Sequence, residues 1–217
     1  MNYVDRYQAG RVLADVLMDY ANRKDTIVLG LPRGGVPVAY EIASKLKLPL
    51  DIFIVRKLGV PGHEELAMGA IASGGTVVFN EETVRTLHIR QDAIDEILNS
   101  EREELARRER VYRGNQPFPA LKDKTIILVD DGIATGYTIR AAIAALKEKN
   151  PAKIIVAVPV AARSTCDELA PLVTAMICPR QPINFYAVGL WYDDFSQTTD
   201  EEVIELLRNQ YNKKTGT

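Results

Sequence analysis

The segment from Ile126 to Thr138 constrains the fold of this chain more than any other. Four apolar residues, Ile126 to Val129, run directly into the adjacent acids Asp130 and Asp131, and a glycine-punctuated turn with two threonines follows. An uninterrupted apolar run of this kind is typical of a parallel strand that is buried on both faces. The turn after it can wrap backbone N–H groups around a phosphate, with the N-terminus of a helix beneath. The acids themselves suit neutral hydroxyls or a hard divalent cation beside that phosphate.

Strand and helix patterns alternate on both sides of this segment. Strands are expected at 26–31, 51–55, 125–129, 153–158 and 174–177, and helices at 8–23, 36–46, 138–149, 165–170 and 200–209. This alternation predicts an α/β fold with a mainly parallel twisted sheet and helices on both faces. Ligands bind such sheets at the carboxyl ends of the strands. The acid pair and the turn Pro32-Arg33-Gly34-Gly35 are both expected at such ends.

The middle of the chain is more polar. Arg56 to Glu65 contains two glycines and a proline and is interpreted as a mobile loop, whereas 66–73 and 76–79 are expected to form a hairpin around Gly74-Gly75. The stretch 82–112 has the pattern of a long charged helix. Its charges alternate in sign, which favours a solvated face over an RNA-contacting one.

Composition narrows the class of protein. The chain has 217 residues, a net charge of -2 and a pI near 5.8, which gives no electrostatic basis for general nucleic-acid binding. No apolar stretch is long enough to span a membrane, and the N-terminus lacks a signal-peptide core. Cys166 and Cys178 lack metal-ligand spacing and are expected to stay reduced. A cytoplasmic protein without membrane contacts is expected.

The segment 126–138 resembles the phosphoribosyl pyrophosphate (PRPP) motif of type I phosphoribosyltransferases at all thirteen positions. With an N-terminal Asp-Arg…Ala-Gly-Arg segment, Pro-Arg-Gly-Gly and Arg-Lys-Leu-Gly, the layout resembles a group of predicted bacterial phosphoribosyltransferases whose acceptor is unassigned. The resemblance implies a transferase of nucleotide metabolism that moves the 5-phosphoribosyl group from PRPP to a nitrogen of a heterocyclic base and releases pyrophosphate. It also implies Mg²⁺ as cofactor and a homodimer. A single phosphoribosyltransferase-like domain is expected over 1–217, with a helical insertion at 82–116 and a hood over the acceptor base at 180–200.

The resemblance also implies roles for individual residues. Asp130 and Asp131 would contact the ribose hydroxyls, directly or through metal-bound water, and are the candidate Mg²⁺ ligands. Arg56, Lys57 and Asp131 are the candidate catalytic residues, with Arg56 and Lys57 on a flexible loop that closes over the pyrophosphate. The candidate substrate-binding residues are Arg33, Gly34, Gly35, Asp130, Asp131, Gly132, Ala134, Thr135, Gly136, Tyr137, Thr138 and Trp191. His63 is a candidate proton donor.

Plainer interpretations of the same residues stay open. The acids could cap the following helix, the Pro32 turn could be merely structural, Arg56-Lys57 could be an exposed basic pair, and Trp191 could be a core residue. Tyr137 stands where a Walker-type nucleotide triphosphatase would have lysine, which disfavours that class.

The acceptor and the activity also leave alternatives. Hypoxanthine-guanine members of the family usually have an acid where this chain has Ala134, so the pattern is closer to orotate, adenine and xanthine enzymes. A regulator of the same fold that senses PRPP or a nucleotide without catalysis is the main alternative. A sugar-phosphate hydrolase would need a nucleophile or metal cluster that the sequence does not offer.

Overall fold

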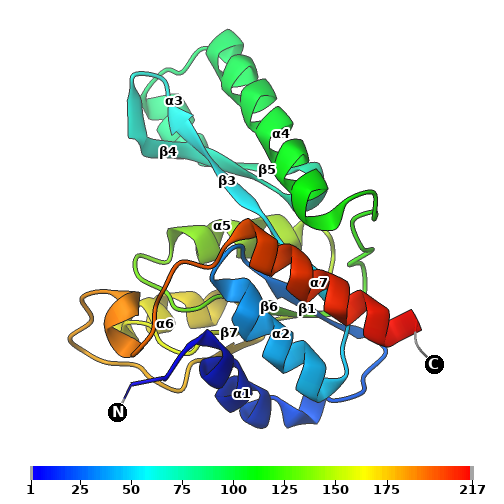
Figure 1. Cartoon of the computed structure of the whole chain (residues 1–217). Helices are drawn as coiled ribbons and strands as arrows, with labels where there is room; N and C mark the ends of the chain where they lie inside the picture. Colours follow the sequence, from blue (N-terminus) through cyan, green and yellow to red (C-terminus); the bar gives the residue numbers. More distant parts are fainter. Residues whose placement is uncertain (1, 216–217) are drawn as a thin grey trace.

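A central parallel sheet organises the chain (Figure 1). The computed structural model describes residues 2–215, with side chains through residue 212. The strands are β1 (Thr26–Gly30), β2 (Leu50–Ile52), β6 (Thr125–Val129), β7 (Lys153–Ala157) and β8 (Ala175–Ile177). Their order is β2-β1-β6-β7-β8, and every neighbouring pair is parallel. The predicted α/β fold with a mainly parallel sheet is confirmed.

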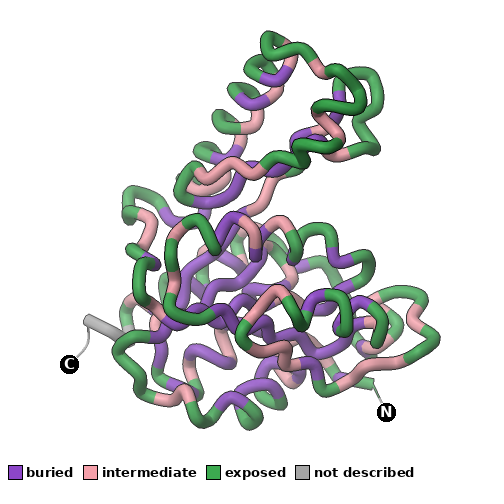
Figure 2. Tube along the Cα trace, turned by 180° about the vertical axis from the view of Figure 1, so that it is seen from behind, coloured by how far each residue is buried: buried purple, intermediate pink, exposed green. Residues whose placement is uncertain are grey.

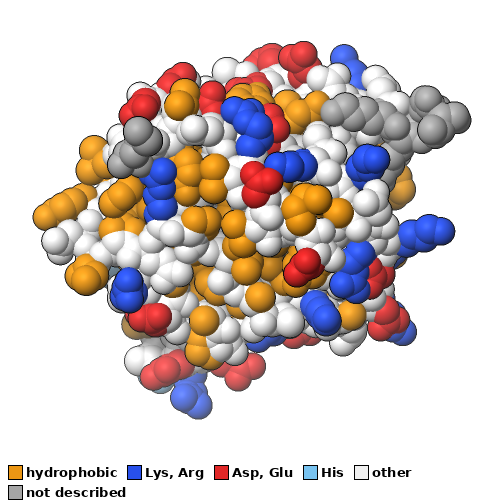
Figure 3. Space-filling model, turned by 90° about the horizontal axis from the view of Figure 1, so that it is seen from below, with side chains coloured by type: hydrophobic (Ala, Val, Ile, Leu, Met, Phe, Trp, Pro, Cys, Tyr) orange, Lys and Arg blue, Asp and Glu red, His pale blue; other side chains and the backbone are white. Residues whose placement is uncertain are grey.

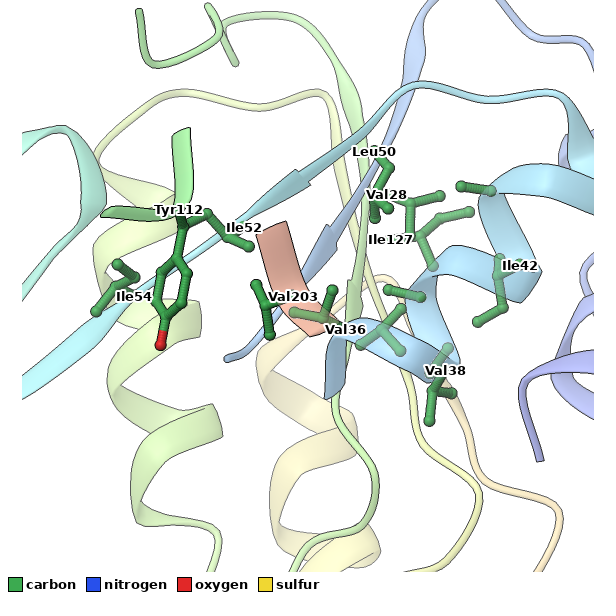
Figure 4. Close-up of a cluster of buried hydrophobic side chains, with 14 of the residues drawn as sticks. Val28, Val36, Val38, Ile42, Leu50, Ile52, Ile54, Tyr112, Ile127 and Val203 are labelled. Atoms are coloured by element: carbon green, nitrogen blue, oxygen red, sulfur yellow. The ribbon is translucent and has the colours of Figure 1, made fainter. Parts of the chain in front are cut away.

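Helices cover both faces of this sheet. Helices α1 (Arg6–Val16), α2 (Gly35–Leu46) and α7 (Asp200–Thr215) pack on one face, and α5 (Tyr137–Lys147) and α6 (Arg163–Leu169) on the other. Alternate strand residues supply the two cores: Val28 and Ile127 pack with α2, as Figure 4 shows, whereas Leu29 and Leu128 pack with α5. The tube in Figure 2 is accordingly buried through its centre.

The helix that follows β1 and the helix that follows β6 leave toward opposite faces of the sheet. Because β1 and β6 are neighbours, their carboxyl ends flank a topological switch point, where the two connections diverge and open a crevice. The two turns singled out in the sequence follow these two strands.

A second, antiparallel sheet forms a lobe that projects from the parallel sheet (Figure 1). It contains β3 (Val55–Val60), β4 (His63–Ala72) and β5 (Thr76–Phe79), and is followed by α3 (Glu81–Thr86) and α4 (Gln91–Arg113). Ile94, Leu98 and Leu105 are the buried apolar side of α4.

Two expectations for this lobe need correction. The segment Arg56 to Glu65 is not a loop, because β3 and β4 pair through it around a tight turn at Gly62, whose φ is 74°. Leu58 and Val60 are buried at alternate positions, but the glycines and Pro61 among the charged residues obscure this strand pattern in the sequence. The long charged helix is divided after Thr86, where His88 adopts a left-handed φ of 50°. The hairpin around Gly74-Gly75 is confirmed.

Other boundaries differ slightly. The first helix ends at Val16 rather than Arg23, and a short 3-10 turn follows it. The 3-10 elements are η1 (Met18–Tyr20), η2 (Ser73–Gly75), η3 (Ala170–Leu172) and η4 (Val188–Trp191). Seen from below, the surface that includes α1 mixes apolar side chains with charges of both signs (Figure 3). Across residues 2–215, no helix has both the length and the apolarity to cross a bilayer.

A buried ion pair joins α4 to the parallel sheet. Arg113 Nε donates to Asp51 Oδ1 at 3.0 Å, and the two side chains are only 3% and 5% exposed. Arg113 Nη2 also donates to the Ile52 carbonyl at 3.2 Å. The C-terminal end of α4 is thereby fixed beside the carboxyl end of β2.

Candidate active site

The two turns at the switch point are packed directly against each other. A β-carbon added to Gly34 would lie 2.1 Å from Asp131 Oδ2, and one added to Gly35 would lie 2.7 Å from the Val129 carbonyl oxygen. Gly34 has an ordinary helical φ of -62°, so space rather than backbone conformation requires glycine there. The Pro32–Arg33 peptide bond in the same turn is cis. The structure thus brings Arg33, Gly34 and Gly35 beside the acid pair.

The acid pair is withdrawn from water. Burial raises the pKa of Asp130, the neighbouring charge of Asp131 raises it further, and a hydrogen bond from the Asp131 N–H to Asp130 Oδ1 at 2.9 Å partly offsets both effects. Burial also raises the pKa of Asp131, against the influence of Arg6, whose Nε donates to Asp131 Oδ2 at 2.8 Å. Two adjacent, desolvated carboxylates repel each other, and a cation or hydroxyl donors would relieve that repulsion.

The donor set suits a magnesium ion that arrives with its ligand. Within the described residues, no cluster of three or more His, Cys, Asp or Glu side chains could hold a metal alone. Mg²⁺ commonly takes only one or two carboxylates and completes its coordination with water and substrate phosphates. Asp130 and Asp131 fit that role, because they offer hard oxygen ligands whose mutual repulsion a divalent cation would offset.

The turn after the acids presents donors to solvent. Ala134, Thr135, Tyr137 and Thr138 are exposed, and Gly136 is the N-cap of α5 with a left-handed φ of 78°. The first-turn N–H groups of a helix lack partners within it, so Thr138 presents both a backbone N–H and a hydroxyl. The first hydrogen bond within α5 runs from the Arg140 N–H to the Gly136 carbonyl, at 2.9 Å. This turn can hold a phosphate beside the acids.

A cleft of about 400 Å³ adjoins the two turns. Arg33 and Thr138 line it together with Phe53, Ile54 and Val55, which follow β2. The Arg33 guanidinium lies 3.8 Å from the Asp200 carboxylate and is 41% exposed, so it can exchange that contact for a ligand. Arg33 and Thr138 therefore line one cleft at the carboxyl ends of the sheet, and the acid pair packs against the glycines that follow Arg33.

Comparison with known proteins identifies this arrangement. The family model described as "Phosphoribosyl transferase domain" matches residues 4–189. The chain belongs to this phosphoribosyl transferase family. Two proteins of Mycobacterium tuberculosis, strains CDC 1551 and H37Rv, bear names that begin "Putative phosphoribosyl transferase" and are each 43% identical over 204 residues. That match takes in 94% of this chain but 46% of those proteins, so the chain spans less than half the length of these curated relatives.

Solved structures agree on the fold of this family member. A Thermus thermophilus protein superposes with a TM-score of 0.85 and 37% identity, over 97% of this chain and 99% of that one. An Aquifex aeolicus protein gives a TM-score of 0.51 with 10% identity, over 85% and 78% of the two chains, which shows likeness of fold alone. The resemblance seen in the sequence is confirmed at the level of the family.

Arg56 and Lys57 lie elsewhere in this phosphoribosyl transferase domain. Arg56 Nε donates to Glu101 Oε2 on α4 at 2.6 Å, and both basic residues line a separate cleft of about 680 Å³ that also contains Glu64 and Glu96. His63 is exposed at the start of β4. The structure therefore does not bring these three residues to the acid pair.

The expected hood segment meets the acid pair through a different aromatic residue. Trp191 is half-buried against the core, and its carbonyl accepts from the Tyr3 N–H at 2.9 Å. The buried Tyr192 hydroxyl instead donates to the Asp131 carbonyl at 2.5 Å. The Phe195 ring lies 3.9 Å below the Arg6 guanidinium, whose Nη1 donates to the Ser196 carbonyl at 2.6 Å.

Sequence reasoning assigned no role to Arg6 or Tyr192 individually. Arg6 does stand in the N-terminal Asp-Arg pair that contributed to the family resemblance, and that pair was the available signal. No periodicity or spacing in the sequence marks Tyr192 as a contact of Asp131.

Proposed function

We propose that this phosphoribosyl transferase domain moves the 5-phosphoribosyl group from PRPP to a nitrogen of a heterocyclic base and releases pyrophosphate. The carbon–oxygen bond to pyrophosphate breaks with its electron pair on the leaving oxygen. A base nitrogen supplies the pair for the new bond to the anomeric carbon and then loses its proton. Positive charge develops on the anomeric carbon of the ribose in the transition state. Positioning the reactants and neutralising charge are therefore the main tasks of the protein.

Each turn has a part in this proposal. Backbone and hydroxyl donors from Thr135 to Thr138 hold the 5-phosphate, supported by the open turn from Gly132 through Ala134 and Gly136. Asp130 and Asp131 hold the ribose hydroxyls, and the turn of Arg33, Gly34 and Gly35 receives the pyrophosphate. When bound, Mg²⁺ would offset the negative charge of the pyrophosphate beside the acids.

Arg56 and Lys57 contribute to binding the leaving pyrophosphate only if Arg56 gives up its contact with Glu101 and contacts the pyrophosphate instead. Arg56 directly follows Val55, which lines the 400 Å³ cleft, so the strand itself reaches the site. Trp191 contributes to the hood from its half-buried position rather than by an open stacking face. The proposal retains a single domain over 1–217 with the insertion at 82–116 and the hood at 180–200, in a cytoplasmic homodimer.

The observation that supports the proposal most is the close apposition of Gly34 and Gly35 with Asp131 and Asp130. A turn that holds an anion and a pair that holds a diol are useful together only for a ligand carrying both groups. PRPP carries a 5-phosphate, a diol and a pyrophosphate within a few bonds. A regulator that senses PRPP without turnover would use the same pocket, so activity has to separate the two functions.

Calorimetric titration with PRPP, with and without Mg²⁺, is the direct test. Pyrophosphate release is then screened over a panel of purines and pyrimidines. We expect Mg²⁺-dependent binding, turnover with one class of base, and at least tenfold weaker binding by Asp131→Asn, since an ionic contact is lost. The exposed Asp167→Asn variant is the matched control and should bind like the wild type. Binding without release on any base would favour the sensor, and no binding at all would refute both.

A further inference from the structure

Helix α4 forms part of the wall of the 400 Å³ cleft. Arg107, Arg108, Val111 and Tyr112 of this helix line the cleft together with Arg33. These arginines belong to the charged stretch that the sequence pattern favoured as a solvated face. As expected, both arginines stay exposed and pair with an acid three or four residues away. They also line the cleft, because the Arg113–Asp51 pair fixes the end of the helix beside β2.

Glu104 holds both arginines in place. Arg107 donates to its two carboxylate oxygens at 2.7 and 2.9 Å, and Arg108 Nε donates at 2.7 Å. These hydrogen bonds lower the pKa of Glu104 to about 2, so it stays ionised at any physiological pH. Both guanidinium groups are thus oriented before a ligand arrives, while their side chains stay 63% and 43% exposed.

A second acid, Asp200, contacts two of the residues that line the cleft. The Tyr112 hydroxyl donates to Asp200 Oδ1 at 2.5 Å, and the Arg33 guanidinium lies 3.8 Å from the same oxygen. Among the described residues that line the cleft, the three arginines outnumber this one carboxylate. Glu104, which binds Arg107 and Arg108, adds a second negative charge beside the cleft and still leaves a net positive one. An anion fits this balance better than a neutral or cationic ligand.

The position of the cleft indicates which anion it would bind. Thr138 belongs to the turn after β6 that is proposed to hold the 5-phosphate, and Arg33 to the turn of Gly34 and Gly35 beside Asp131. The cleft is therefore continuous with the places assigned to phosphate and ribose. Resting on the proposed function, we propose that Arg107 and Arg108 complete the binding site for the pyrophosphate end of PRPP, opposite Arg33. Glu104 is the positioning residue for both. In this arrangement the helical insertion supplies the cations that Arg56, engaged by Glu101, does not.

The test is calorimetric titration of the intact chain with three probes in the presence of Mg²⁺: inorganic pyrophosphate, ribose 5-phosphate and PRPP. The variants are Arg107→Ala, Arg108→Ala, the double variant, and Arg108→Lys. Arg102→Ala is the matched control, because Arg102 is an exposed arginine on the same helix outside the residues that line the cleft. Thermal unfolding of each variant checks that the fold is intact.

We expect the double variant to lose at least tenfold in affinity for pyrophosphate and for PRPP, while ribose 5-phosphate binds within about twofold of the wild type. Arg108→Lys should recover part of the loss, since it keeps the charge but not the planar fork. Arg102→Ala should behave as the wild type.

Two binding results would overturn the proposal: unchanged pyrophosphate affinity in a folded double variant, or an equal loss for pyrophosphate and ribose 5-phosphate. The proposed function is judged separately, by turnover of the wild type. A wild type that binds pyrophosphate through these arginines but releases none from PRPP would support this site and refute the transferase. A wild type that turns over PRPP while the double variant does so equally well would refute this site alone.

Discussion

Arg6 Nε donates to Asp131 Oδ2 at 2.8 Å across a sequence separation of 125 residues, and the two side chains are only 11% and 15% exposed. The first helix is thereby tied to the acid that follows the central strand. Because the same guanidinium also stacks on Phe195, three distant segments converge on one carboxylate. Arg6 thus holds one oxygen of the Asp131 carboxylate, Oδ2.

Replacing Arg6 by alanine should weaken PRPP binding about tenfold and lower the free energy of unfolding by about 1–2 kcal/mol, since a charge-assisted hydrogen bond is lost. Without its partner the pKa of Asp131 should rise further, so the loss of affinity should be larger at pH 6 than at pH 8. Titration at both pH values measures this. Arg11→Ala, which removes the exposed contact between Arg11 on the same helix and Glu41 on α2, is the control. An Arg6→Ala protein that binds as tightly as the wild type would show that the contact is only structural.

Asp130→Asn should stabilise the ligand-free protein while it weakens PRPP binding. The folded-state pKa of Asp130 is raised by burial and by Asp131, so the stability that this group contributes is present below pH about 4 and is lost as pH rises through the raised value. Above the unfolded-state pKa, the raised folded-state pKa of Asp130 therefore costs stability. Asparagine keeps the acceptor for the Asp131 N–H without the charge.

We expect a gain of about 1 kcal/mol at pH 7.5, or about 2–4 °C in Tm, and almost none at pH 4. Thermal unfolding at the two pH values measures it, with the exposed Asp167→Asn variant showing no shift at either. A lower Tm for Asp130→Asn at pH 7.5 would contradict the assigned repulsion.

The sequence patterns predicted those parts of the site that consecutive residues form. The run from Ile126 to Val129 had to be a buried strand, and the acids and glycines after it had to form a turn at its carboxyl end, whatever the rest of the chain did. The turn after β6 and the turn after β1 were predicted for this reason. That these two turns lie close together followed from the rules of parallel sheets, which place the carboxyl ends of adjacent strands at one edge.

Contacts between segments far apart in sequence were out of reach. Arg6 meets Asp131 because α1 packs beside the central strands, and nothing in the spacing around either residue encodes that. Arg107 and Arg108 carry the same pattern as any solvated helix, and only the buried anchor at Arg113 turns them toward the cleft. The β3–β4 ribbon was mistaken for a loop because Gly59, Pro61 and Gly62 interrupt the segment and charged residues flank its two buried side chains, Leu58 and Val60.

Gly34→Ala should abolish tight PRPP binding. The added β-carbon would meet Asp131 Oδ2 at 2.1 Å and Arg6 Nε at 3.1 Å, so either the turn or the acid has to move. Overpacking of this kind costs about 1–3 kcal/mol of stability. Titration with PRPP and urea unfolding measure the two effects. Gly75→Ala, at a φ of 76° with open space around it, should lose about 1–2 kcal/mol of stability without changing PRPP affinity. Equal binding by Gly34→Ala and the wild type would mean that the turn of Gly34 and Gly35 is not part of the site.

The buried Arg113–Asp51 pair should be the strongest single determinant of how α4 sits on the sheet. Removing one partner leaves an unpaired buried charge, so Arg113→Ala should lower the free energy of unfolding by about 3–5 kcal/mol. The double variant Arg113→Met with Asp51→Leu removes both charges and should lose less than Arg113→Ala alone. Urea unfolding of the two variants measures the difference, and Arg102→Ala on the exposed side of α4 should change stability by no more than about 0.5 kcal/mol. If the double variant were less stable than Arg113→Ala, the unpaired charge of Asp51 would not be the cause of the loss.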